Sequence, residues 1–241
     1  MNFDPTRMIA AALACSFALA APGFAQDTAP AAETEAAAPA DAQREPAAGA
    51  EAEAPSEYVD DIILGDPEAP LTIIEYASFT CVHCANFHRD TFPTLKAEYI
   101  DTGLVQFIQR DVYFDAPGLW AGVLARCGGD EKFYPVAGLL LDRQAEWTSG
   151  NTAEDYANAL RRLGAQTGLS QEQIDACWAD QEKTERLLRT FQRNAEADNI
   201  NSTPSFVING ELTSNLPWPQ LKEKIDAELA ELGVDPASAG N

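Results

Sequence analysis

The stretch that decides the fold is LTIIEYASFTCVHC, residues 71–84. Its first nine residues are mostly apolar and rich in β-formers, which is typical of a buried strand. The strand pattern stops at Thr80, and Cys81-Val82-His83-Cys84 follows. Residues 85–100 then carry apolar side chains at helical spacing. We therefore expect a strand, a Cys-x-x-Cys motif and a helix in direct succession.

The segments that follow predict a βαβ unit. Pro93 should kink the helix of residues 85–100 without abolishing it. A second strand is expected over residues 105–113, in the run VQFIQRDVY. Two strands joined by one helix imply parallel pairing with a right-handed crossover.

Beyond this unit, residues 116–199 show helix signals and no convincing strand. Thr152 with Asp155 and Ser170 with Gln173 are spaced as helix caps. Strands then return over residues 204–208 and 211–213, joined by Asn-Gly, which is a strong hairpin signal. A last helix opens at Pro219, with one buried face formed by Leu221, Ile225, Leu229 and Leu232.

The composition excludes several classes of partner. The chain has 241 residues, of which 38 are acidic and 16 basic, giving a net charge of -22. Phosphate binding depends on clustered Lys and Arg, so no nucleic acid is expected as a partner. Outside the N-terminus no apolar run reaches about 18 residues, so we expect no stable membrane insertion of the mature protein.

The N-terminal region predicts export. Arg7 precedes an apolar run from Met8 to Ala21, and small residues follow up to Ala25, so residues 1–25 are interpreted as a cleaved signal peptide. Residues 26–56 are rich in Ala, Pro and Glu, and they predict a disordered linker because they offer almost nothing to bury. Residues 234–241 are expected to form a flexible tail. The expected location is the periplasm.

The Cys-x-x-Cys context predicts redox chemistry. At the start of a helix, Cys81 meets free N–H groups and the positive end of the helix dipole, which lower a thiol pKa. Cys81 is therefore the expected attacking sulfur, and Cys84, one turn further, the buried resolving thiol. His83 can donate a hydrogen bond to the thiolate and so stabilise the reduced form.

Two other interpretations of the same residues remain open. A purely structural disulfide between Cys81 and Cys84 would close a very short loop and gain little stability. A zinc or copper site could use both cysteines with His83 and His88. Because His83 lies between the cysteines and would converge poorly with them on one ion, we predict no metal.

Residues 75–84, the helical block and Ser202-Thr203-Pro204-Ser205-Phe206 together resemble the DsbA family of secreted thiol oxidoreductases. The resemblance covers about Tyr58 to Leu232. It implies an α/β, thioredoxin-like fold: a central mixed sheet of βαβ plus ββα, residues 57–115 and 200–233, with an all-helical domain, residues 116–199, inserted. It also implies oxidation of folding exported proteins, a membrane redox partner that resets the disulfide, and no cofactor.

The resemblance also assigns roles to three further residues. Pro204 matches a cis proline that faces the disulfide, where the Thr203 backbone would pair with an extended substrate. Glu75, six residues before Cys81, matches a buried carboxylate that shuttles the proton of the resolving thiol. The residues by themselves also allow an ordinary strand-start proline and a solvent-exposed strand residue.

Cys127 and Cys177 are the remaining cysteines of the expected mature chain. An exported protein has no reducing buffer to keep them free, so we predict a structural disulfide, as in part of the DsbA-like family. Two separately buried thiols are the alternative. The direction of electron flow also stays open: many family members carry Pro where this chain has Val82, and Thr203 before the proline occurs in isomerase and reductase relatives too.

Overall fold

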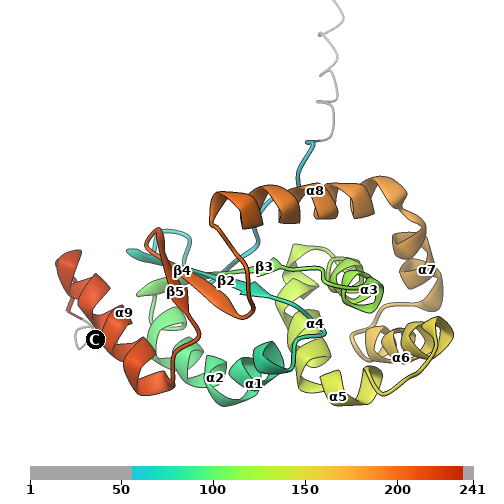
Figure 1. Ribbon diagram of the computed structural model, residues 1–241, viewed down its shortest axis with the longest axis horizontal. Coiled ribbons are helices and arrows are strands. Elements are labelled where there is room, and N and C mark those ends of the chain that lie inside the picture. The colour runs from blue at the N-terminus through green and yellow to red at the C-terminus, as the bar shows by residue number, and fades with distance from the viewer. Residues whose placement is uncertain (1–55, 236–241) are drawn as a thin grey trace, which may run out of the picture. The chain divides into compact units, whose positions relative to one another are not determined.

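A computed structural model of the chain describes residues 56–235 (Figure 1). The predicted signal peptide of residues 1–25, the predicted linker except Ser56, and the tail beyond Asp235 lie outside the described residues.

Within residues 56–235, five strands form one mixed sheet in the order β1-β3-β2-β4-β5. β2 and β3 are parallel, and the other neighbouring strands are antiparallel. This confirms the predicted α/β, thioredoxin-like fold of βαβ plus ββα. The short strand β1 was not predicted, because two residues carry no alternating pattern. The strands are β1 (Ile63–Leu64), β2 (Leu71–Ala77), β3 (Val105–Asp111), β4 (Ser205–Ile208) and β5 (Glu211–Ser214).

The helices fall into two groups around this sheet. The first group joins or follows the strands: α1 (Val82–Asp90), α2 (Phe92–Leu95), a π-helical turn (Lys96–Ile100) and α9 (Trp218–Glu231). The second group lies between β3 and β4: α3 (Ala116–Ala125), α4 (Asp130–Asp142), α5 (Gln144–Trp147), α6 (Ala153–Gln166), α7 (Gln171–Ala179) and α8 (Gln181–Ala197).

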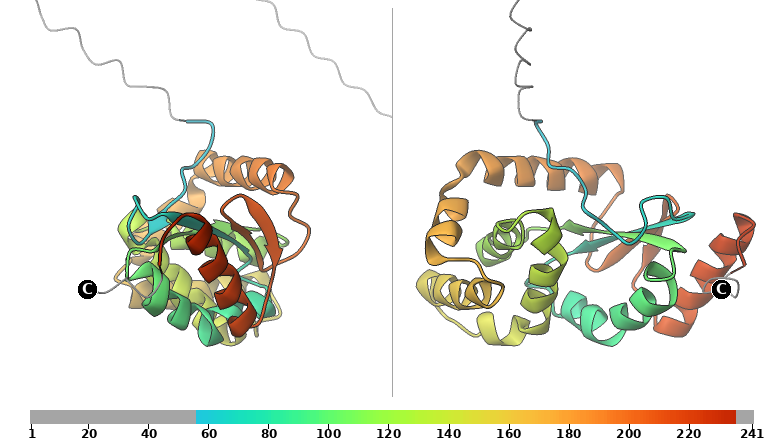
Figure 2. Two further views of the ribbon diagram at one scale, coloured as in Figure 1. Left: turned by 90° about the vertical axis from the view of Figure 1, so that its left-hand side faces the viewer. Right: turned by 180° about the vertical axis from the view of Figure 1, so that it is seen from behind.

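Helices cover both faces of the sheet (Figure 1 and Figure 2). On one face α1, α2 and α9 pack against apolar side chains of the strands, including Ile73, Phe107 and Phe206. On the other face α8 lies across the sheet, and its Phe191 packs against Tyr76 and Val207. The sheet is therefore buried between two helical layers.

The core of the helical block is continuous with the end of β2 and the start of α1. Residues of α3 to α7 pack in one cluster with Ala77, Phe79 and Cys84. The segment that carries the Cys-x-x-Cys motif therefore lies where the helical block meets the sheet. A displacement of the sheet or of the helical block would therefore shift the segment that carries the motif, because close-packed interiors transmit strain.

Three details differ from the expectations. Pro93 does not kink one helix: α1 ends at Asp90, and Pro93 stands in the first turn of a new segment, α2, because a proline lacks the N–H that a helix interior needs. Leu232 does not join the buried face of α9, because the helix ends at Glu231 and Leu232 is 44% exposed. α4 was not predicted; it contains Pro135 and begins after Gly129.

The hairpin between β4 and β5 was predicted correctly. Asn209 and Gly210 adopt φ values of 48° and 87°, and a two-residue type I′ turn requires positive φ at both positions. The caps predicted at Thr152 and Ser170 are also present, each as a full capping box.

A disulfide links Cys127, just after α3, to Cys177 in α7. The two sulfurs are 2.05 Å apart and the Cα atoms 5.8 Å apart, within the range of an ordinary disulfide. The alternative of two separately buried thiols therefore does not describe this structure. The bond holds the C-terminal end of α3 against α7 across 50 positions of sequence.

Candidate active site

Cys81 and Cys84 differ in exposure because of their places at the start of α1. Cys81 is the N-cap residue, with extended backbone angles, and its carbonyl accepts hydrogen bonds from the N–H groups of Cys84 and Ala85 at 3.1 and 3.2 Å. Cys84 lies inside the first turn and is fully buried, whereas Cys81 is partly exposed. Both are free thiols in this structure. Only the sulfur of Cys81 is therefore accessible to react with a thiol or a disulfide of another protein.

The two sulfurs also differ in acidity. The pKa of Cys81 is lowered to about 5, chiefly because the Cys84 thiol hydrogen-bonds to its sulfur. Partial burial opposes this, while the Thr203 side chain and the backbone N–H groups of Cys84 and His83 add to the lowering. The pKa of Cys84 is raised, first by the same hydrogen bond and then by burial. At neutral pH the pair is a Cys81 thiolate beside a protonated Cys84.

The loop before β4 brings Thr203 and Pro204 to this pair. The peptide bond between them is cis, and the carbonyl of Thr203 lies 3.4 Å from the sulfur of Cys81. Residues separated by 122 positions in sequence thus meet at the exposed sulfur.

Glu75 lies beneath the pair on β2, opposite Gln109 of β3. Its side chain is almost completely buried, with the residue 3% exposed, and within residues 56–235 its Oε1 has no hydrogen-bond partner. The pKa of this carboxyl is raised to about 8, chiefly by burial and further by the charges of Cys81 and Asp111. The structure therefore agrees with the interpretation of Glu75 as a buried carboxylate and not with that of a solvent-exposed strand residue.

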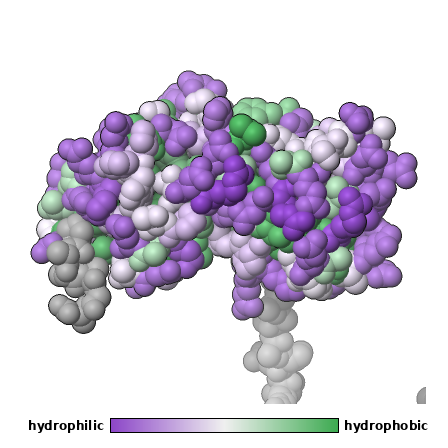
Figure 3. Space-filling model, turned by 90° about the horizontal axis from the view of Figure 1, so that it is seen from below, coloured by the Kyte–Doolittle hydropathy of each residue, from purple (hydrophilic) through white to green (hydrophobic). Residues whose placement is uncertain are grey.

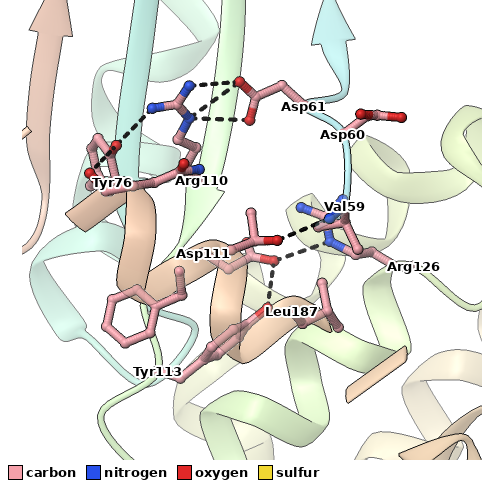
Figure 4. A pocket seen from close by; sticks show the side chains of 12 residues that line it. Val59, Asp60, Asp61, Tyr76, Arg110, Asp111, Tyr113, Arg126 and Leu187 are labelled. Atoms are coloured by element: carbon pink, nitrogen blue, oxygen red, sulfur yellow. Dashed lines mark hydrogen bonds and ion pairs between the residues drawn. The ribbon is translucent and has the colours of Figure 1, made fainter. Parts of the chain in front are cut away.

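Asp111, the second buried carboxylate, belongs to a cluster that reaches the helical block (Figure 4). It lies 3.5 Å from Arg126 and accepts hydrogen bonds from Tyr113 and Gln109. Burial raises its pKa and the neighbouring Arg126 opposes that shift. Because Arg126 directly precedes the disulfide-bonded Cys127, the disulfide holds the helix end that carries this cation.

His83 and His88 both lie on α1. The His83 side chain is exposed, and in the described chain no hydrogen bond joins its imidazole to Cys81; the backbone N–H of His83 acts instead. His88 stacks on Phe92 in the last turn of α1. Among residues 56–235, no three His, Cys, Asp or Glu side chains are placed to hold a metal ion.

Gln144 is a site residue that sequence reasoning missed. It is buried in α5, and its Nε2 donates to the carbonyls of Phe79 and Cys81 at 2.8 and 2.9 Å. The helical block thereby holds the turn that presents Cys81. A single Gln inside a short helix gives no sequence signal for this contact, because its partners lie more than 60 positions away.

The Cys81 pKa predicts a pH dependence of both ionisation and stability. Thiolate absorbance of the reduced protein should appear with a midpoint near pH 5, and the Cys84→Ala variant should shift that midpoint upward because it removes the largest cause of the lowering. In the unfolded chain Cys81 titrates near its ordinary value of 9.0. Cys81 should therefore contribute a component of the free energy of unfolding that rises with pH between about 5 and 9. Glu75, whose pKa is raised from 4.5 to about 8, contributes a fall over an overlapping range, so the Cys81 component is measured as the difference in pH dependence between the reduced protein and a Cys81→Ala variant. A midpoint near 9 would contradict the assignment.

Replacing Gln144 by Met should release the turn that carries Cys81. The carbonyls of Phe79 and Cys81 each lose the hydrogen bond from Gln144, although the Cys81 carbonyl keeps those from Cys84 and Ala85. We expect this loss to lower the free energy of unfolding by about 1 to 3 kcal/mol and to move the Cys81 midpoint. Gln166→Met, at the exposed end of α6, is the matched control. Urea unfolding and thiolate absorbance provide the two measurements, and equal behaviour of both variants would disprove a positioning role.

Known proteins are similar to this chain in sequence. The family model described as Thioredoxin matches residues 57–227. A Rickettsia typhi protein named as a protein-disulfide oxidoreductase is 33% identical over 172 residues, which are 71% of this chain and 63% of that protein. The match therefore spans less than two thirds of that relative's length. Disulfide bond formation protein D of Bacillus subtilis is 26% identical over 183 residues, covering 69% of this chain and 76% of that protein.

A solved structure has a similar fold. The crystal structure of Wolbachia pipientis alpha-DsbA1 superimposes with a TM-score of 0.65 at 27% identity, covering 72% of this chain and 92% of that one. The family model, the named relatives and this structure agree with one another. The chain belongs to the thioredoxin family, and it is similar to proteins named as protein-disulfide oxidoreductases and to a DsbA structure.

Proposed function

We propose that this chain is an exported thiol:disulfide oxidoreductase that donates its Cys81–Cys84 disulfide to folding proteins. The observation that carries the proposal is the inequality of the two sulfurs, one exposed with a lowered pKa and one buried with a raised pKa. In such a pair the exposed sulfur forms the mixed disulfide with the substrate, and the buried sulfur acts as the resolving thiol.

The proposed reaction starts from the oxidised form. A substrate thiolate attacks the sulfur of Cys81, the Cys81–Cys84 bond breaks, and the Cys84 sulfur leaves and takes a proton from Glu75. A second substrate thiolate then attacks the substrate sulfur of the mixed disulfide. The substrate disulfide forms, and Cys81 leaves as a thiolate. Because its pKa is about 5, Cys81 is a good leaving group, which favours donation of the disulfide.

The surroundings of Cys81 support binding of an extended substrate. The backbone of Thr203 lies beside the exposed sulfur, where we infer that a substrate strand pairs with it. A hollow of about 310 Å³ lies alongside, lined by residues of α1 that include His83 and Phe87 and by Leu216 and Pro217 before α9. On the face nearest α1 and α2, hydrophobic groups form small separate patches among hydrophilic side chains (Figure 3), which suits polypeptides better than a membrane.

We infer the periplasm as the location and a membrane redox partner as the source of oxidising equivalents. Residues 1–25 support export through their signal-peptide pattern. No helix within residues 56–235 has the length and apolar character needed to cross a bilayer. The partner would accept electrons from Cys81 through the same exposed sulfur.

A reductase or isomerase of the same fold is the second candidate. It is favoured by the absence, within the described residues, of a hydrogen bond from the His83 imidazole to Cys81, since such a bond would stabilise the reduced form. The metal-binding alternative has no comparable support.

Trapping of the mixed disulfide tests the mechanism. Cys84→Ser should accumulate mixed disulfides with exported proteins, because the sulfur that would release them is gone, while Cys81→Ser should form none. Non-reducing electrophoresis followed by mass spectrometry identifies the products. Equal trapping by the two variants, or none by Cys84→Ser, would count against the roles given to these sulfurs.

The reduction potential of the Cys81–Cys84 pair separates the two directions of electron flow. We expect equilibration with glutathione buffers to give a value near the roughly −120 mV of DsbA, as suits a disulfide donor. A value near the roughly −270 mV of thioredoxin would instead establish the reductase.

A further inference from the structure

The loop that carries Thr203 joins the end of α8 to the start of β4, over residues 198–204. Within the described chain, no hydrogen bond between backbone groups holds residues 201–204. The place of the Thr203 carbonyl beside Cys81 therefore depends on how the two ends of this loop are held. At the β4 end, the Ser205 hydroxyl donates to the carbonyl of Ser202 at 2.8 Å.

At the α8 end, the side chain of Asp198 is held by the sheet. Its carboxylate accepts hydrogen bonds from the Tyr76 hydroxyl of β2 and from Nη1 of Arg110 in β3, the latter at 3.0 Å. Tyr76 and Arg110 are partners in the register of the two strands, and the same Nη1 donates to the Tyr76 oxygen at 2.7 Å. Because β2 and β3 are internal strands, both donors stand on a rigid part of the fold.

The contacts of Asp198 are shielded from water. Tyr76 is completely buried, and the side chains of Arg110 and Asp198 are 20% and 26% exposed. Interactions between charges are stronger where water is partly excluded. The Tyr76 hydroxyl also lies 3.1 Å from the carbonyl of Asn194, in the last turn of α8. One tyrosine thus holds both the end of the helix and the first residue of the loop.

The residues after Asp198 leave the helix along a defined path. Asn199 adopts a positive φ of 55°. The N–H of Ile200 then bonds to the carbonyl of Ala195 at 2.8 Å, and the Ile200 side chain packs against the cluster that contains Tyr76. The anchor at Asp198 therefore sets the direction in which the chain runs toward Thr203.

Arg110 also binds a second carboxylate, which has no link to the loop. Its Nε and Nη2 donate to Asp61, just before β1, at 3.1 and 2.7 Å (Figure 4). The Asp61 side chain is 31% exposed, close to the 26% of Asp198. One arginine thus makes two ion pairs of similar exposure, of which only one reaches the Thr203 loop. Asp61 therefore supplies an internal comparison for Asp198.

We propose that Asp198, held by Tyr76 and Arg110, is the anchor that positions the Thr203 backbone for an extended substrate. The inference rests on the proposed function and adds a positioning residue to it. Asp198 touches neither the substrate nor Cys81; it acts by fixing the loop five residues before Thr203. Directional control matters here, because hydrogen bonds between a substrate strand and Thr203 weaken steeply when their angles are poor.

Four variants test the anchor. Asp198→Ala removes the carboxylate, and Tyr76→Phe keeps the buried ring and deletes only the hydroxyl. Asp198→Asn retains an oxygen acceptor for both donors and should restore most of what Asp198→Ala loses. Asp61→Ala removes the other ion pair of Arg110 and is the matched control.

The measurement is the stopped-flow rate at which the Cys81–Cys84 disulfide oxidises a dithiol peptide, as a function of peptide concentration. We expect Asp198→Ala and Tyr76→Phe to raise the concentration for half-maximal rate by about threefold to tenfold, as for the loss of one backbone hydrogen bond. Asp61→Ala should leave that concentration unchanged. Dithiothreitol has no peptide backbone to pair with Thr203, so its rate should stay close to that of the unsubstituted protein in all variants.

The Cys81 thiolate titration supplies an independent sign that the loop has moved. Thr203 contributes to the lowered pKa of Cys81, so the midpoint of the reduced protein should shift upward in Asp198→Ala and Tyr76→Phe. It should stay in place in Asp61→Ala, since a purely structural ion pair has no reason to affect the sulfur.

The outcomes separate the anchor from the proposed function. Equal changes in Asp198→Ala and Asp61→Ala, or an unaltered peptide dependence in both Asp198→Ala and Tyr76→Phe, would overturn the anchor and leave the oxidoreductase in place. Parallel losses with the peptide and with dithiothreitol would show general damage to the site and would overturn it too. Failure of the unsubstituted protein to oxidise the peptide would instead overturn the proposed function itself.

Discussion

The unequal solvation of two sulfurs one helical turn apart is the constraint on which this structure depends. Cys81 is the extended N-cap residue before α1 and Cys84 lies inside the first turn of that helix, so the same turn exposes one sulfur and buries the other. The Cys84 thiol then stabilises the Cys81 thiolate, since the two share a hydrogen bond. Every other part of the site modifies this pair: Thr203 beside it, Glu75 below it and Gln144 behind it.

Holding that turn requires both halves of the chain. The sheet supplies β2, which delivers Cys81 to the end of a buried strand, and the helical block supplies Gln144 and the apolar packing around Phe79. The disulfide at Cys127 fixes the block from within and places Arg126 near the buried Asp111. The helical insertion therefore contributes directly to the electrostatics of the site.

The sequence predicted what short-range patterns encode. The strand before Cys81, the hairpin at Asn209 and the caps at Thr152 and Ser170 each have a local signature, and each was found. Gln144 and the unpaired Glu75 oxygen depend on contacts between segments distant in sequence, which no local pattern reports. α4 lies within the predicted helical block but was not predicted as a separate helix, and Pro135 stands inside it, beyond the first turn.

Charge couples the exposed sulfur to the buried carboxyl. In the reduced protein the Cys81 thiolate helps raise the pKa of Glu75 to about 8, so at neutral pH Glu75 keeps its proton. In the disulfide Cys81 carries no charge, and the pKa of Glu75 must fall below that value, although burial still raises it. Each change of redox state thus changes the proton affinity of a group sealed from the substrate surface.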